Sequence, residues 1–279
     1  PSKATLDKYG KYVAETAEFM ADWAKACAPK GGTIKLFGQT AMQESMSKDF
    51  SYHHPFEQAY WVYGLTVAQQ WRERQGLERN AEWDDIISRM APLAENGDIY
   101  AAGVPLAEFD SKAKSTEFDP FVAAEQAGRK QVSAEDFALK SRSDHPAVLG
   151  ACGLLPYYPA LYDKAKMAKT LDWVMQNWNW PTTWGWDYGM IAMTAARLGR
   201  PETALEALLI DKGKNTYLVS GHNFQEPKRL RLYMPGNGSL LAAVAMMCAG
   251  WDGCAEPSNP GFPKDGKWNV RWEGFQRMQ

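Results

Sequence analysis

Histidine is scarce in this chain of 279 residues, which contains only four. Three of them lie in His53-His54-Pro55 and Asp144-His145-Pro146, and the fourth is His222. None has the i, i+4 spacing of the paired histidines that bind zinc on one helix face. The four cysteines form no Cys-x-x-Cys pair either. We therefore predict neither a metal site nor a cofactor, and we expect Asp144 to cap a helix that begins at Pro146.

The chain also lacks an excess of basic residues and a long apolar run. Its 31 Lys and Arg against 33 Asp and Glu give a net charge of -2. Little positive charge is therefore left to neutralise phosphates, which argues against a nucleic-acid partner. The longest apolar stretch, residues 240–247, is far shorter than the roughly 20 residues that span a bilayer, so we expect no membrane partner. No secretory signal is evident, but in an exported protein Cys248 and Cys254 could pair.

Strand patterns are nearly absent, and apolar residues recur at helical spacing along most of the chain. We predict one all-α domain over residues 1–279, with a polar excursion at about 98–140 and an irregular tail at 251–279. Glycine, proline and capping residues set the boundaries. The predicted helices span residues 4–27, 56–74, 81–90, 146–154, 163–178, 184–198, 201–209 and 239–249.

Long loops alternate with short turns between these helices. The long loops cover residues 31–54, 179–187 and 211–238, with a short hairpin expected in the last. In toroids built from helical hairpins, such loops gather on one face and carry the active site. The fold prediction is therefore an α/α hairpin toroid with its site on these loops.

The first of these loops carries Gln43 and Glu44. A carboxyl beside Phe50, Tyr52 and Trp61 could be desolvated, which would raise its pKa and make it a proton donor near neutral pH. The alternative is a solvated loop glutamate without a role in chemistry.

The second loop is rich in tryptophan, in a chain with 12 Trp and 12 Tyr. Four tryptophans fall within residues 178–186, which is hard to bury in a core. Flat aromatic faces stack on the apolar faces of sugars, so we predict a sugar-binding wall that includes Trp184 and Trp186. Asp187 could bind sugar hydroxyls or simply begin the next helix.

The third loop contains Gly221-His222-Asn223-Phe224-Gln225-Glu226. The side chains of His222, Asn223 and Gln225 offer the paired donors and acceptors that sugar hydroxyls require. Glu226 is the only carboxylate between residues 211 and 252, so it is the natural second acid; the alternative is an ion pair with Lys228, Arg229 or Arg231. Asn237 lies in Pro-Gly-Asn-Gly, where glycines and a helix start favour an anion or tight packing.

Taken together, several sequence motifs of this chain resemble those of the six-hairpin glycosidases, in particular of a bacterial group similar to glycoside hydrolase family 65. The resemblance covers most of the chain except residues 98–140. It is carried by residues 16–21, 43–44, 144–149, 178–187, 214–226 and 232–253.

The resemblance implies an (α/α)6 barrel whose inverting reaction uses two carboxylic groups on α-linked glucosides or related oligosaccharides. By position, Glu44 matches the acid and Glu226 the base. A phosphorylase on the same scaffold and a non-catalytic carbohydrate-binding domain stay open. Twelve helices complete such a barrel, whereas we predict about eight or nine. We therefore expect a missing N-terminal segment or a second chain to supply the rest.

Overall fold

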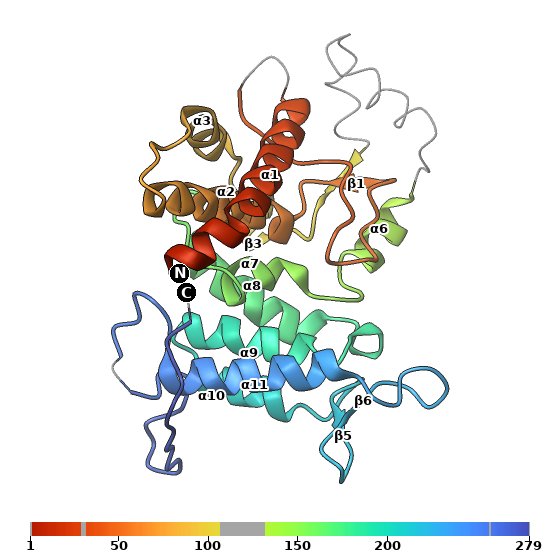
Figure 1. Ribbon diagram of the computed structural model, residues 1–279. Coiled ribbons are helices and arrows are strands. Elements are labelled where there is room, and N and C mark those ends of the chain that lie inside the picture. The colour runs from red at the N-terminus through yellow and green to blue at the C-terminus, as the bar shows by residue number, and fades with distance from the viewer. Residues whose placement is uncertain (1, 29–31, 107–131, 257, 279) are drawn as a thin grey trace.

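The protein is mainly helical, as the sequence predicts. The computed structural model describes residues 2–28, 32–106, 132–256 and 258–278 (Figure 1). Within these residues there are nine α-helices, and no helix is long and apolar enough to cross a membrane. They are α1 (Lys3–Cys27), α2 (Pro55–Arg74), α3 (Ala81–Arg89), α6 (Ala134–Lys140), α7 (Ala147–Gly153), α8 (Lys164–Asn177), α9 (Asp187–Arg197), α10 (Pro201–Leu209) and α11 (Met234–Ala249).

The strands are short and form three antiparallel pairs of two residues each. β1 (Ser51–Tyr52) pairs with β4 (Val104–Pro105), and β2 (Glu95–Asn96) pairs with β3 (Ile99–Tyr100). β5 (Thr216–Tyr217) and β6 (Asn223–Phe224) form the hairpin expected in the last long loop. These pairs shape loops and do not form a core sheet.

Local signals place most helix ends where the sequence predicts them. The Asn80 side chain accepts hydrogen bonds from the amides of Glu82 and Trp83 and so caps α3, and Asp163 caps α8 in the same way. Gly199, with a φ of 70°, separates α9 from α10. Two predicted starts are wrong. α9 begins at Asp187 and not at Trp184. α11 begins at Met234, so Pro-Gly-Asn-Gly forms its first turn and does not precede it.

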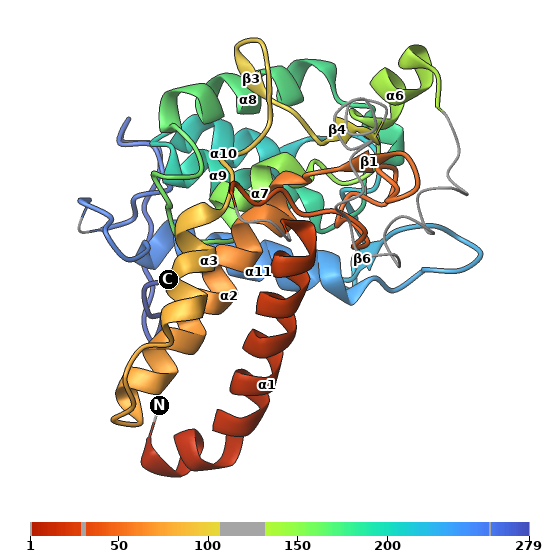
Figure 2. The ribbon, with the colours of Figure 1, turned by 90° about the horizontal axis from the view of Figure 1, so that it is seen from above.

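Five helices pack side by side in the order α1, α2, α7, α9 and α11, and three more flank this row. α3 packs on α1 and α2, α8 packs on α7 and α9, and α10 packs on α9. Figures 1 and 2 show this row, and the start of α1 and the end of α2 project from the molecule together. The polar excursion carries α6, while residues 107–131 lie outside the described part.

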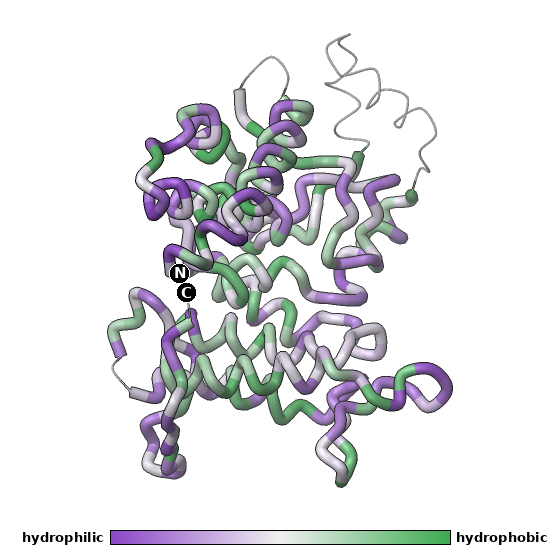
Figure 3. The backbone as a smooth tube through the Cα atoms, in the orientation of Figure 1, coloured by the Kyte–Doolittle hydropathy of each residue, from purple (hydrophilic) through white to green (hydrophobic). Residues whose placement is uncertain are grey.

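The core is centred on α9, in which every residue is buried. α11 is apolar around most of its circumference (Figure 3), yet Leu241 remains 70% exposed. All four cysteines are free thiols, and three of them are buried, so Cys248 and Cys254 do not pair.

Candidate functional site

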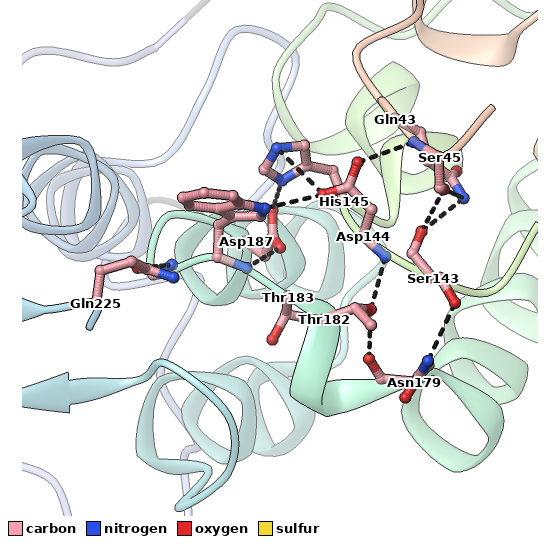
Figure 4. A network of polar contacts seen from close by, with 12 residues as sticks. Gln43, Ser45, Ser143, Asp144, His145, Asn179, Thr182, Thr183, Asp187 and Gln225 are labelled. Carbon is pink, nitrogen blue, oxygen red and sulfur yellow. Dashed lines mark hydrogen bonds and ion pairs between the residues drawn. The ribbon is translucent and has the colours of Figure 1, made fainter. Parts of the chain in front are cut away.

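Three segments that are distant in sequence meet at one polar network (Figure 4). They are the loop before α2, which carries Gln43 to Ser45, the turn before α7, which carries Ser143 to His145, and the loop between α8 and α9. The sequence predicts two of these three as site loops. It gives no comparable role to the turn before α7.

The backbone around Glu44 is held from both sides. Gln43 is buried, and its side-chain Nε2 donates to the carbonyls of Lys140 at 3.0 Å and Ser143 at 2.9 Å. The Ser45 hydroxyl lies 2.8 Å from each of the same two carbonyls. Gln43 is thus a structural anchor, while Glu44 itself is exposed.

A second anchor comes from the first turn of α2. The Glu57 carboxylate accepts a hydrogen bond from the amide of Met42, two residues before Glu44. Burial raises the pKa of Glu57 to about 7, against the opposing effect of this bond. A desolvated carboxyl is therefore found at Glu57 and not at Glu44. Of the two possibilities for Glu44, the structure shows the solvated one: Glu44 is exposed, and Phe50, Tyr52 and Trp61 do not bury it.

Asp144 links the loop of Glu44 to the tryptophan loop. Its Oδ2 accepts from the amide of Ser45 at 3.1 Å, and its Oδ1 accepts from Nε1 of Trp184 at 2.9 Å. The prediction that Asp144 caps the next helix is wrong, because α7 starts after Pro146 without a side-chain cap. The side chain points away from the helix and towards two other segments.

His145 and Asp187 form a buried pair beside Asp144. Nδ1 of His145 lies 2.7 Å from Oδ1 of Asp187, whose Oδ2 accepts from the amide of Trp184 at 2.7 Å. Burial raises the pKa of Asp187 to about 6, against the pull of His145. Burial lowers the pKa of His145, but the bond to Asp187 and nearby carboxylates outweigh it and leave that pKa raised.

Two further carboxylates, those of Asp144 and Glu44, act on this pair. The charges of Asp187, Asp144 and Glu44 all act on His145, and the same three act on Tyr233 at the start of α11. Burial, followed by these charges, raises the pKa of Tyr233 to about 12. Glu44 therefore belongs to one electrostatic site with Asp144 and Asp187.

The four tryptophans of the second loop divide into two groups. Trp178 and Trp180 are buried in the core, so the prediction of a continuous sugar-binding wall is wrong for them. Trp184 and Trp186 are half-buried and lie beside His145, at centroid distances of 6.1 and 4.5 Å. Nζ of Lys214 lies over the Trp184 ring, 4.1 Å from its centroid, so this lysine partly covers one face of the ring.

Most polar side chains of the third loop serve its own structure. Asn237 accepts from the amide of Asn223 and donates to the carbonyl of Gly221, so it ties the β5–β6 hairpin to α11. Oε1 of Gln225 accepts from the amide of Gly185 at 2.9 Å, which joins the second and third loops. His222 is exposed.

Glu226 forms the ion pair that we considered as its alternative. Its Oε1 lies 2.7 Å from Nε of Arg229, and its side chain is 35% exposed. This pair is accessible to solvent, so it contributes little stability and does not prevent Glu226 from acting on a ligand.

The sequence did not point to Ser45, Glu57 or Tyr233. The only sequence feature that indicates a role for Glu57 is its place in the first turn of a helix that begins at Pro55, where a carboxylate can accept from backbone amides. No group of three or more His, Cys, Asp or Glu side chains in the described part is arranged to hold a metal ion.

Comparison with known proteins adds no relative. No protein-family model matches the chain, and no curated protein is significantly similar to it.

Proposed function

We propose that this chain is a glycoside hydrolase domain, of the inverting type, that acts on α-linked glucosides or related oligosaccharides. Glu44 is its general acid and Glu226 its general base. The observation that carries the proposal is the exposed carboxylate of Glu44 on an anchored backbone. Gln43, Ser45 and Glu57 hold that backbone. The amide of Ser45 also bonds to Asp144, which accepts from the half-buried Trp184.

Fixed geometry is what general acid catalysis requires of a carboxyl group. A proton donor must lie within hydrogen-bond reach of the leaving oxygen, and small misplacements cost large factors in rate. Among the described residues, no side chain or amide bonds to the Glu44 carboxylate, so it is free to meet a substrate. An exposed glutamate without a role would need no such anchored backbone.

The charge of the site favours hydrolysis over phosphorolysis. Glu44, Asp144 and Asp187 gather around His145 and Tyr233. The Asp187 carboxylate is paired with His145, but a phosphate dianion that enters this site would still meet those of Glu44 and Asp144, and like charges repel. Water carries no such penalty, which supports a hydrolase.

The helix packing is consistent with part of a hairpin toroid. From α2 onwards, and apart from the short helix α6, members of the central row alternate along the chain with flanking helices: α2, α3, α7, α8, α9, α10 and α11. We propose that the row is the inner layer of such a toroid and that further helices complete it. The described site lies where the row's connecting loops meet.

Glu44→Gln tests the acid. On an α-linked disaccharide, whose leaving group needs a proton, kcat/KM should fall by about 10² to 10⁴. On a 2,4-dinitrophenyl α-glucoside, whose leaving group departs without one, the loss should be much smaller. Glu226→Gln should instead reduce the hydrolysis of both substrates, because the attacking water is common to them.

Asp49→Asn is the matched control, since Asp49 is an exposed acid on the same loop. Its activity should equal that of the parent protein. Equal activity of Glu44→Gln and the parent on the disaccharide would overturn the proposal. Sugar binding by calorimetry without turnover would identify a carbohydrate-binding domain instead. Activity that depends on phosphate would identify a phosphorylase.

A further inference from the structure

We infer that Asp144 is a positioning residue that holds Glu44 and Trp184 in fixed relation to each other. The catalytic consequence rests on the proposed role of Glu44. The structural consequence, that one carboxylate joins the two loops, does not.

The two groups that donate hydrogen bonds to the Asp144 carboxylate belong to different loops. The amide that donates to Oδ2 of Asp144 is that of Ser45, and its nitrogen closes the peptide bond with Glu44. The bond therefore acts on the backbone of Glu44 directly. The second donor is the indole Nε1 of Trp184, which lies on the opposite loop.

The backbone of Asp144 is itself held by hydrogen bonds. Its amide donates to the hydroxyl of Thr182 at 2.7 Å, and its carbonyl accepts from Nε1 of Trp178 at 2.8 Å. Its φ is 66°, in the left-handed region that few residues other than glycine, asparagine and aspartate adopt. Four bonds to four different residues thus orient one side chain.

The two hydrogen bonds from Ser45 and Trp184 require a carboxylate at position 144. Each oxygen faces an N–H donor, and a carboxylate is an acceptor at both. An asparagine of the same shape has one oxygen and one NH₂ group. Whichever way it turned, it would place a donor against either Ser45 or Trp184. Because asparagine tolerates the left-handed region as well as aspartate does, Asp144→Asn changes the bonds and spares the backbone.

The first readout does not depend on activity. In Asp144→Asn the NH₂ group must face one of the two donors, so hydrogen exchange at either the Ser45 amide or the Trp184 indole, followed by NMR, should accelerate by about tenfold or more as that bond is lost. Asp163→Asn is the control, because Asp163 also accepts from a backbone amide but caps α8. It should leave the exchange of Ser45 unchanged.

The second readout is kinetic. Asp144→Asn should lower kcat on the disaccharide by about 10²-fold, as expected for a displaced acid, and should affect the dinitrophenyl glucoside far less. In the Glu44→Gln background the same substitution should add little further loss, because both changes act through one group. A general loss of structure would reduce both substrates equally in either background.

Unchanged exchange at both the Ser45 amide and the Trp184 indole in folded Asp144→Asn would overturn the inference, whatever Glu44 does. If that variant does not fold, Asp144→Gly replaces it, since glycine also adopts the left-handed region at this φ of 66° but offers no side-chain acceptor. It should also accelerate exchange at Ser45, and unchanged exchange would again overturn the inference. If Ser45 responds but no glycoside is cleaved by the parent protein, the proposed function fails and the linkage stands.

Discussion

A buried carboxyl at Glu57 supports the loop that carries Glu44, and burial holds its pKa at about 7. One of its oxygens accepts from the amide of Met42, while the other finds no partner among the described residues. A protonated carboxyl suits this position better than a charged one, because burying an unpaired charge is costly. The support of the site is thus sensitive to pH near neutrality.

Glu57→Gln should change the pH dependence of stability. The folded protein keeps the Glu57 proton from its ordinary pKa of 4.5 up to about 7, whereas the unfolded chain loses it. The stability that this proton confers is present below pH 4.5 and lost as pH rises through 7. Relative to Glu57→Gln, the parent should therefore lose on the order of 3 kcal/mol of unfolding free energy between pH 4.5 and 8.

Urea unfolding at several pH values measures this difference. Glu78→Gln provides the control, because Glu78 is exposed. A constant difference between Glu57→Gln and the parent across this range would contradict the buried, neutral carboxyl.

Some individual residues of the site were predictable from the sequence, whereas the roles of others depend on contacts between distant segments. Gln43, Glu44, Trp184 and Asp187 were identified from their loops, and they lie in or beside the observed network. The role of Asp144 was mistaken, because local spacing suggests a cap while its actual partners are 99 and 40 residues away. The Glu57 bond to Met42 likewise spans a loop whose path no local pattern specifies.

Among the helices, α11 begins with a turn that contains two glycines, of which only one lies against a neighbouring side chain. A Cβ on Gly236 would lie 2.4 Å from Oδ1 of Asn223, a fully buried side chain held by two backbone carbonyls. A Cβ on Gly238 would have no neighbour within 4 Å. The close approach of α11 to the β5–β6 hairpin therefore depends on Gly236 alone of the two.

We expect Gly236→Ala to lower the unfolding free energy by about 1 to 3 kcal/mol, as an overpacked site does. Gly238→Ala should raise it by about 0.5 to 1 kcal/mol, because alanine favours the helix more than glycine does. Thermal unfolding of the two variants measures both effects. Equal effects would show that the hairpin does not pack on this turn.

The elements themselves were largely predictable, because apolar spacing and capping residues act locally. The ends of α1, α3, α8 and α10 fall within a residue of the predicted positions. The start of α11 was predicted too late, since Pro-Gly-Asn-Gly is typical of a turn. Packing against Asn223 overrides that preference and makes the same residues helical.

At the scale of the molecule, the row of helices has a buried centre and open ends. Leu65 of α2 is fully buried between its neighbours, while Leu241 of α11 is 70% exposed at one end of the row. The sequence could not predict which of the two leucines is covered, because apolar residues are spread around both helices and neither has one dominant apolar face. That difference arises only from the order in which the helices pack.

Leu65→Ala should cost about 2 to 5 kcal/mol of unfolding free energy, as deletions of buried leucine side chains do. Leu241→Ala should change it by less than about 0.5 kcal/mol. Chemical denaturation provides both values. A large loss at Leu241 would mean that the end of the row is covered.

The central position of α9 also bears on how the chain is made. Every residue of α9 is buried, and the helices that cover it include α10 and α11, which follow it in the sequence. A ribosome therefore releases α9 when α7 and α8 can already pack on it but α10 and α11 cannot. During that interval the nascent chain presents an apolar helix to the surrounding solution, and a chaperone has a natural binding site there. Chains truncated before α11 should depend on such help permanently, and they should accumulate as insoluble material when it is withheld.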